Sequence, residues 1–165
     1  MNRIYNVLFL CTGNSARSIM AEALLNVLGA DRFHAFSAGS YPSGQVQPMA
    51  ADLAMSLGYP EDHMRSKSWD EFAAAGAPEM DMVITVCDNA AGEACPVWIG
   101  HPALAHWGVP DPVAVEGDDA RKRAFVAAFA TLRRRVELLL ALPLDKLDRL
   151  AAEAKLREIG QVGSA

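Results

Sequence analysis

The sequence predicts an α/β fold in which a four-stranded parallel sheet carries helices on both of its faces. Apolar, strand-like runs alternate with helical patterns along most of the chain, and this alternation is typical of parallel strands joined by crossover helices. The chain has 165 residues, of which 52% are hydrophobic and 21% are charged. It is therefore long enough to bury a core of its own.

Four apolar segments are the expected strands. Residues 4–10 and 82–87 form two longer runs that are apolar almost throughout, as expected of strands covered on both faces. Shorter runs at residues 33–37 and 104–107 complete the predicted sheet.

The expected helices occupy most of the chain between and after these strands. Pro143 divides the C-terminal part, because proline cannot continue a helix. We therefore expect an α/β domain over residues 1–142 and an extra helical extension over residues 143–165. The predicted helices lie at residues 19–28, at residues 46–57, between Gly117-Asp118-Asp119 and Pro143, and at residues 144–159.

The segment Cys11-Thr12-Gly13-Asn14-Ser15-Ala16-Arg17-Ser18, called the oxyanion loop below, joins the first strand to the first helix. Backbone N–H groups in such a loop and at a helix N-terminus favour negative charge. We expect all residues from Thr12 to Ser18 to bind an oxyanion, Arg17 to hold two of its oxygens, and the local field to lower the Cys11 pKa. The alternative is a buried structural cysteine with a solvated Arg17, but three turn-forming residues between them favour the binding loop.

Cys87 and Cys95 flank a stretch of small and polar residues. Cys87 ends the third strand, and ligands bind beyond the carboxyl ends of parallel strands, so we expect it at the same sheet edge as Cys11. Three neighbouring thiols could exchange disulfides. Two alternatives remain: cysteines that only pack, or a zinc site with His101 and His106, for which the cysteine spacing is too wide.

Asp111 lies between two prolines in Val109-Pro110-Asp111-Pro112. The prolines restrict the backbone around it, so a carboxyl group held there is a candidate general acid. The alternative is an ordinary turn.

The net charge of −5 indicates no broad basic surface for nucleic acid. The longest apolar runs are too short to span a bilayer. We find no signal-peptide pattern before the first strand, and we expect a cytoplasmic protein with reduced thiols and no bound metal or organic cofactor.

The oxyanion loop, the Met20-Ala21-Glu22 that follows it, and Asp111-Pro112 resemble the low-molecular-weight protein tyrosine phosphatase fold family. Within that family, the loop sequence, Cys87 with Cys95-Pro96, and His106-Trp107-Gly108 are similar to the thioredoxin-coupled type of arsenate reductase. Phosphatases of this family usually carry a second cysteine where this chain has Ala16, and aromatic residues after Asp-Pro.

This resemblance implies reduction of arsenate to arsenite, with phosphate or sulfate as mimics of the substrate. It implies that Cys11 attacks arsenic, Asp111 protonates the leaving hydroxide, and Cys87 and Cys95 pass on the disulfide. The reductant would be thioredoxin or a glutaredoxin- or mycoredoxin-type protein. Phosphomonoester hydrolysis by a low-molecular-weight phosphatase is the alternative, and an oxyanion sensor that uses the same thiols would not need Asp111.

Two features depart from the resemblance. The spacing between Cys87 and Cys95 is slightly longer than in the best-known reductases. Some relatives also carry an acidic side chain near Ser66-Lys67-Ser68 that helps to bind potassium, and here Lys67 and Ser68 stand in that neighbourhood.

Overall fold

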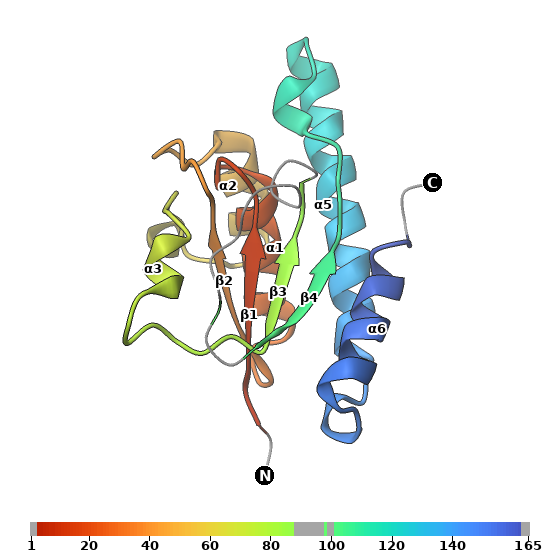
Figure 1. Cartoon of the computed structure of the whole chain (residues 1–165). Helices are drawn as coiled ribbons and strands as arrows, with labels where there is room; N and C mark the ends of the chain where they lie inside the picture. The colour runs from red at the N-terminus through yellow and green to blue at the C-terminus, as the bar shows by residue number, and fades with distance from the viewer. Residues whose placement is uncertain (1–2, 88–97, 99–100, 163–165) are drawn as a thin grey trace.

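The computed structural model describes residues 3–87, 98 and 101–162, and the predicted parallel sheet is confirmed. The strands lie in the order β2-β1-β3-β4 (Figure 1). The chain passes from β1 to β2 and then crosses to the other side of β1, so the direction of winding changes between β1 and β3. The strands are β1 (Tyr5–Leu10), β2 (Phe33–Ala38), β3 (Met82–Thr85) and β4 (Ala103–His106).

The strand register aligns the carboxyl ends of all four strands. Leu10 at the end of β1 pairs with Ala38 of β2 and with Thr85 of β3, and Thr85 pairs in turn with His106 of β4. The segments that follow these residues therefore leave the sheet at one edge, where parallel sheets bind their ligands.

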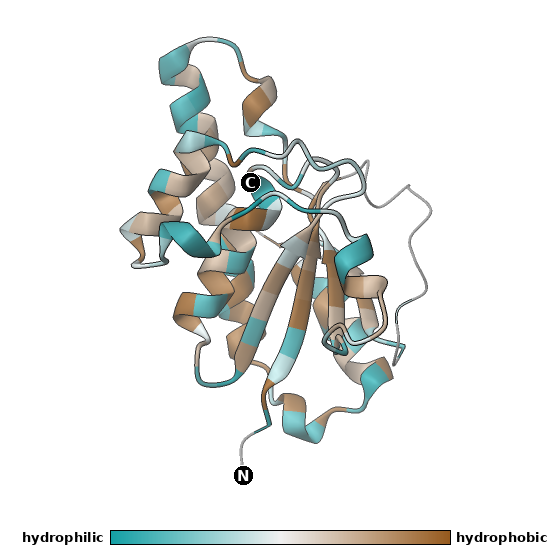
Figure 2. Cartoon of the chain, turned by 90° about the vertical axis from the view of Figure 1, so that its left-hand side faces the viewer, coloured by the Kyte–Doolittle hydropathy of each residue, from teal (hydrophilic) through white to brown (hydrophobic). Residues whose placement is uncertain are grey.

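Helices cover both faces of the sheet, as predicted. Helices α1 and α5 lie on one face, and the short helix α3 lies on the other (Figures 1 and 2). Helix α3 was not predicted, because four residues are too few to show a helical period. The helices are α1 (Arg17–Leu28), α2 (Pro48–Ser56), α3 (Asp70–Ala73), α5 (Asp118–Leu140) and α6 (Arg149–Ile159), with 3₁₀ turns at Glu61–His63, Pro112–Ala114 and Leu144–Lys146.

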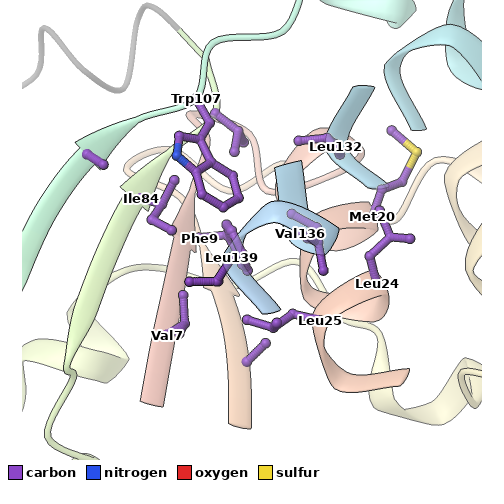
Figure 3. Close-up of a cluster of buried hydrophobic side chains, with 14 of the residues drawn as sticks. Val7, Phe9, Met20, Leu24, Leu25, Ile84, Trp107, Leu132, Val136 and Leu139 are labelled. Carbon is purple, nitrogen blue, oxygen red and sulfur yellow. The ribbon is translucent and has the colours of Figure 1, made fainter. Parts of the chain in front are cut away.

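The main core lies between the sheet and helices α1 and α5. Phe9 of β1 packs against Trp107, with ring centroids 6.0 Å apart. Leu132, Val136 and Leu139 of α5 face the same cluster (Figure 3). Burial of side chains of this size stabilises a fold by about 1.5–3 kcal/mol each, so this cluster anchors the sheet edge that carries the loops.

Helix α6 packs on β4 and contributes to the same core cluster, through Ala152, Leu156 and Ile159. Asp148 caps its N-terminus by accepting a hydrogen bond from the backbone N–H of Ala151. The helix that was expected after Pro143 is therefore present and is anchored on the sheet.

Candidate active site

The oxyanion loop leaves β1 and enters α1 with its carbonyl groups directed outward. The carbonyl oxygens of Thr12, Gly13 and Ser15 accept backbone hydrogen bonds from residues 41, 43 and 47, at 2.8–3.0 Å. The hydroxyl of Ser66 also donates to the Gly13 carbonyl. Because these carbonyl groups bond to residues outside the loop, the loop N–H groups can face its interior and donate hydrogen bonds to an anion there.

Asn14 holds the shape of the loop. Its φ of 43° places it in the left-handed region, which asparagine tolerates better than most residues. Its buried side chain donates to the Ser18 hydroxyl at 2.8 Å and accepts the backbone N–H of Lys67 at 2.9 Å. Because Ser18 receives this bond, its own hydroxyl proton is available to another acceptor.

Gly39 allows the segment after β2 to approach the loop closely. A Cβ atom at this position would lie 2.3 Å from the Thr12 carbonyl oxygen and 2.6 Å from that of Cys11. Any side chain here would therefore displace the oxyanion loop.

The first turn of α1 is open to an anion. Ala16 is the N-cap residue and has no side-chain oxygen to accept the first N–H groups of the helix. These groups and the positive end of the helix dipole favour an oxyanion at this position.

Arg17 connects the loop to the predicted general acid. Its Nη1 atom donates to the carbonyl of Val109 at 3.0 Å, and its Nη2 atom lies 3.7 Å from a carboxylate oxygen of Asp111. The Arg17 side chain is mostly buried, whereas the Asp111 side chain is 44% exposed. Asp111 also accepts the backbone N–H of Val113, so its carboxyl group is held in place but remains open to solvent and substrate.

Cys11 and Cys87 are both buried free thiols, and they lie close enough for Cys87 to raise the pKa of the Cys11 thiol. The Cys87 sulfur also lies 3.3 Å from the backbone nitrogen of Thr12. The sheet edge thus brings together Cys11, Arg17, Cys87 and Asp111. The sequence predicted the shared edge for Cys11 and Cys87, and the catalytic roles of the four residues stay a prediction.

The pKa of Cys11 differs from the prediction. The contact with Cys87 and burial raise the pKa of the Cys11 thiol well above its ordinary value, although Arg17 acts to lower it. The expectation of a lowered pKa considered only the loop and Arg17. The neighbouring thiol and burial both disfavour the charged form of Cys11, and together they outweigh the effect of Arg17.

Cys95 lies outside the described residues, so the structure does not place the third thiol. For the same reason, the zinc alternative that included Cys95 is not tested. Among the described residues, no group of three or more histidine, cysteine or acidic side chains could hold a metal ion. No helix in the described part of the chain is long and apolar enough to cross a membrane.

The sequence analysis missed a buried polar cluster behind the oxyanion loop. Glu22 on α1 accepts hydrogen bonds from the hydroxyls of Ser37 and Tyr59, and the Lys67 ammonium lies 3.8 Å from its carboxylate. The Lys67 ammonium also donates to the Arg65 carbonyl at 3.0 Å. The available sequence signal was an acidic residue inside the apolar run of α1.

The buried cluster supports the loop through its backbone. Burial lowers the pKa of Lys67, while Glu22 acts in the opposite direction. The same lysine donates its backbone N–H to Asn14. Lys67 therefore joins a buried ion pair to the residue that shapes the oxyanion loop.

Comparison with known proteins agrees with this geometry. Residues 6–155 match the family model of low molecular weight phosphotyrosine protein phosphatases. The chain belongs to this family. The resemblance on which the sequence analysis relied is thereby confirmed, and with it the assignment of the fold.

The curated relatives of this family member are named arsenate reductases. The chain is 36% identical over 118 residues to the arsenate reductase of Halalkalibacterium halodurans, covering 72% of this chain and 81% of the relative. It is 34% identical over 119 residues to that of Bacillus subtilis, covering 72% and 82%.

Solved structures agree with the family assignment. A structure described as an arsenate reductase in the phosphate binding state is 28% identical, with a TM-score of 0.67, and the match covers 84% of this chain and 98% of the other. A thioredoxin-dependent arsenate reductase from Corynebacterium glutamicum shares the fold at 23% identity and a TM-score of 0.58, over 87% of this chain and 64% of the other.

Proposed function

We propose that this member of the phosphatase family reduces arsenate to arsenite with its own cysteines. The observation that carries the proposal is a second buried free thiol beside Cys11: the Cys87 sulfur lies 3.3 Å from the backbone nitrogen of Thr12 in the oxyanion loop. A phosphatase needs one nucleophile, whereas a two-electron reduction needs two thiols that can form a disulfide. The names of the curated relatives support the same reading.

The first step is attack on arsenic. Arsenate binds to the N–H groups of the oxyanion loop and to Arg17, and the Cys11 sulfur, as the thiolate, forms a bond to arsenic. The proton of the Cys11 thiol is transferred to one oxygen of the arsenate. Asp111 donates a second proton to that oxygen, its bond to arsenic breaks, and it leaves as water.

The second step transfers the electrons. The Cys87 sulfur attacks the Cys11 sulfur, the sulfur–sulfur bond forms, and the sulfur–arsenic bond breaks. The electron pair of that bond stays on arsenic, which leaves as arsenite and takes the proton of the Cys87 thiol, while the two cysteines are oxidised to one disulfide. The position of the Cys87 sulfur, 3.3 Å from the backbone nitrogen of the residue that follows Cys11, supports this step.

The third step regenerates Cys11. Cys95 attacks Cys87, a Cys87–Cys95 disulfide forms, and Cys11 leaves as a thiolate. An external dithiol protein then reduces the new disulfide. Thioredoxin is the first candidate, because it is the reductant named for the Corynebacterium structure with this fold, and a glutaredoxin- or mycoredoxin-type protein is the alternative. Such a cycle requires a reducing compartment such as the cytoplasm.

The test measures two activities of the same purified protein. Arsenite formation is followed with thioredoxin, thioredoxin reductase and NADPH, and hydrolysis of an aryl phosphate is followed separately. We expect arsenite formation to be the efficient reaction. Efficient hydrolysis without arsenite formation would show that the chain is a low-molecular-weight phosphatase, the alternative that the family match supports.

A further inference from the structure

Arg135 is a buried arginine that the proposed mechanism does not use. It lies on α5 and is only 1% exposed. Its Nε atom donates to the Val162 carbonyl at 3.0 Å, and its Nη1 atom donates to the Gly108 carbonyl at 3.1 Å. No carboxylate within the described ranges forms a salt bridge with it. Burying a cation is costly unless its donors are paired, so in the described part of the chain these two carbonyl groups hold the guanidinium in position.

One of the two carbonyls belongs to the turn that leads from β4 to the proposed acid. On one side of Gly108, Trp107 is fully buried in the core (Figure 3). On the other side, the backbone N–H of Val109 donates to the Val86 carbonyl, and the Val109 carbonyl accepts a hydrogen bond from the Arg17 guanidinium. Asp111 follows two residues later. Arg135 therefore holds the turn at Gly108, directly before the residue that contacts Arg17 and three positions before Asp111.

The other carbonyl belongs to the segment after α6, which closes against the same turn. The indole N–H of Trp107 donates to the Leu156 carbonyl at 2.9 Å. A Cβ atom on Gly160 would lie 2.2 Å from the His106 carbonyl oxygen, so the segment packs closely on the end of β4. The family match ends at residue 155, and Val162 lies beyond it.

Helix α6 is also fixed along the edge strand. Glu153 accepts the backbone N–H of Leu104 at 2.9 Å, and Arg157 donates to the carbonyl of the same residue at 3.2 Å. These two side chains satisfy backbone groups of β4 that would otherwise face solvent at the sheet edge. The C-terminal segment thus has a defined position from which to hold Arg135.

We propose that Arg135 is a positioning residue that ties the C-terminal segment to the turn carrying Asp111. The C-terminal helix is then part of the scaffold of the active site. The inference rests on the proposed function, since it assumes that Asp111 donates a proton. Displacement of that turn would slow the proton-dependent step, whereas the oxyanion loop would still bind substrate.

The test measures a single turnover, so that it does not depend on the identity of the reductant. Reduced full-length protein is mixed with arsenate, and the loss of free thiols is followed over a range of arsenate concentrations. The variants are Arg135→Met, Arg135→Lys and Gly160→Ala, with Arg134→Met as the matched control on the exposed face of the same helix. Hydrolysis of p-nitrophenyl phosphate is measured in parallel.

We expect Arg135→Met to lower the saturating rate about tenfold, because small displacements of catalytic groups cost at least this much. The arsenate concentration at half-saturation should stay within about twofold, since the loop N–H groups do not depend on the turn and Arg17 is anchored on α1 even if its bond to Val109 is weakened. Arg135→Lys should recover part of the rate, because an ammonium can reach one of the two carbonyls. Gly160→Ala should resemble Arg135→Met, and Arg134→Met should resemble the wild type.

Several results would overturn the inference. One is a folded Arg135→Met protein that keeps the wild-type rate. Another is a variant in which the arsenate concentration at half-saturation rises by as large a factor as the saturating rate falls. If Arg135→Met does not fold, Arg135→Lys and Gly160→Ala decide, and unfolding of all three would make Arg135 a purely structural residue.

Asp111→Asn separates failure of the inference from failure of the proposed function. We expect this variant to lose about 10²-fold or more in rate, as for a general acid. A wild-type rate in Asp111→Asn would remove the proposed acid without reference to Arg135. If the wild type hydrolyses p-nitrophenyl phosphate but does not react with arsenate, reduction is excluded, and the rates of hydrolysis then decide the role of Arg135.

Discussion

The backbone N–H of Thr12 points at the sulfur of Cys87, and the two atoms are 3.3 Å apart. A donor of the oxyanion loop is therefore used by the second thiol in the resting protein. An oxyanion that bound this N–H would have to displace the Cys87 sulfur from it. We therefore expect oxyanion binding and the position of the second thiol to be linked.

Substitution of Cys87 should separate reduction from hydrolysis. We expect Cys87→Ser to stop arsenate turnover, because no second thiol can attack the Cys11–arsenic adduct, and to spare any aryl phosphate hydrolysis. Cys11→Ser is the control and should abolish both reactions, because its hydroxyl stays protonated where a thiolate is needed. Arsenite formation at the wild-type rate in Cys87→Ser would contradict the proposed relay.

Removal of the Cys87 sulfur should also lower the pKa of Cys11. The thiolate fraction rises as the pH passes through the pKa, so a lower pKa moves the onset of alkylation to lower pH. In Cys87→Ala, Arg17 still lowers the pKa, and we expect Cys11 to react with iodoacetamide about tenfold faster at pH 7, which corresponds to one pKa unit. Peptide mass analysis across a pH series gives the midpoint.

Cys95→Ala is the matched control for this measurement, because it removes a thiol but keeps Cys87, which raises the pKa of Cys11. Its alkylation midpoint should equal that of the wild type. An unchanged midpoint in Cys87→Ala would mean that burial alone raises the pKa of Cys11.

The last step of the relay predicts a particular disulfide. After one equivalent of arsenate without reductant, we expect peptide mapping to find Cys87 joined to Cys95. The product places the disulfide away from Cys11 and frees its thiolate, which is the better leaving group when bound among the loop N–H groups. If only a Cys11–Cys87 disulfide is found and Cys95 still alkylates, Cys95 takes no part, and the reductant must attack the first disulfide.

Loss of the buried lysine should destabilise the fold. The side chains of Lys67 and Glu22 are 8% and 5% exposed, so Lys67→Met leaves the Glu22 carboxylate buried without its cationic partner. We expect the free energy of unfolding to fall by about 3–5 kcal/mol, as for other broken buried ion pairs. Chemical denaturation followed by circular dichroism measures the change.

Two further variants test whether the charge of Glu22 is the cause. Lys67→Met combined with Glu22→Gln should be more stable than Lys67→Met alone, because no buried charge is left unpaired. Arg65→Met breaks an exposed pair with Glu71 and should change stability by less than about 1 kcal/mol. If the double variant is no more stable than Lys67→Met, the lysine acts through packing and not through its charge.

The sequence by itself determined the features that depend on neighbouring residues. The apolar runs identified the strands, and the Cys11–Ser18 segment identified the oxyanion loop, because a strand, a turn and a helix N-terminus follow one another within a few residues. The alternation of strands and helices placed Cys11 and Cys87 at one sheet edge, since the ends of parallel strands lie at the same side.

Only the tertiary structure decided the features that depend on residues far apart in the chain. The pKa of Cys11 is raised by Cys87, which is 76 positions away by residue number, and by burial. Lys67 meets Glu22, and Arg135 meets Gly108, through folding of separate elements against one another. Burial and contact distance control these interactions, and neither is expressed in a local pattern, because both depend on how the whole chain excludes water around each group.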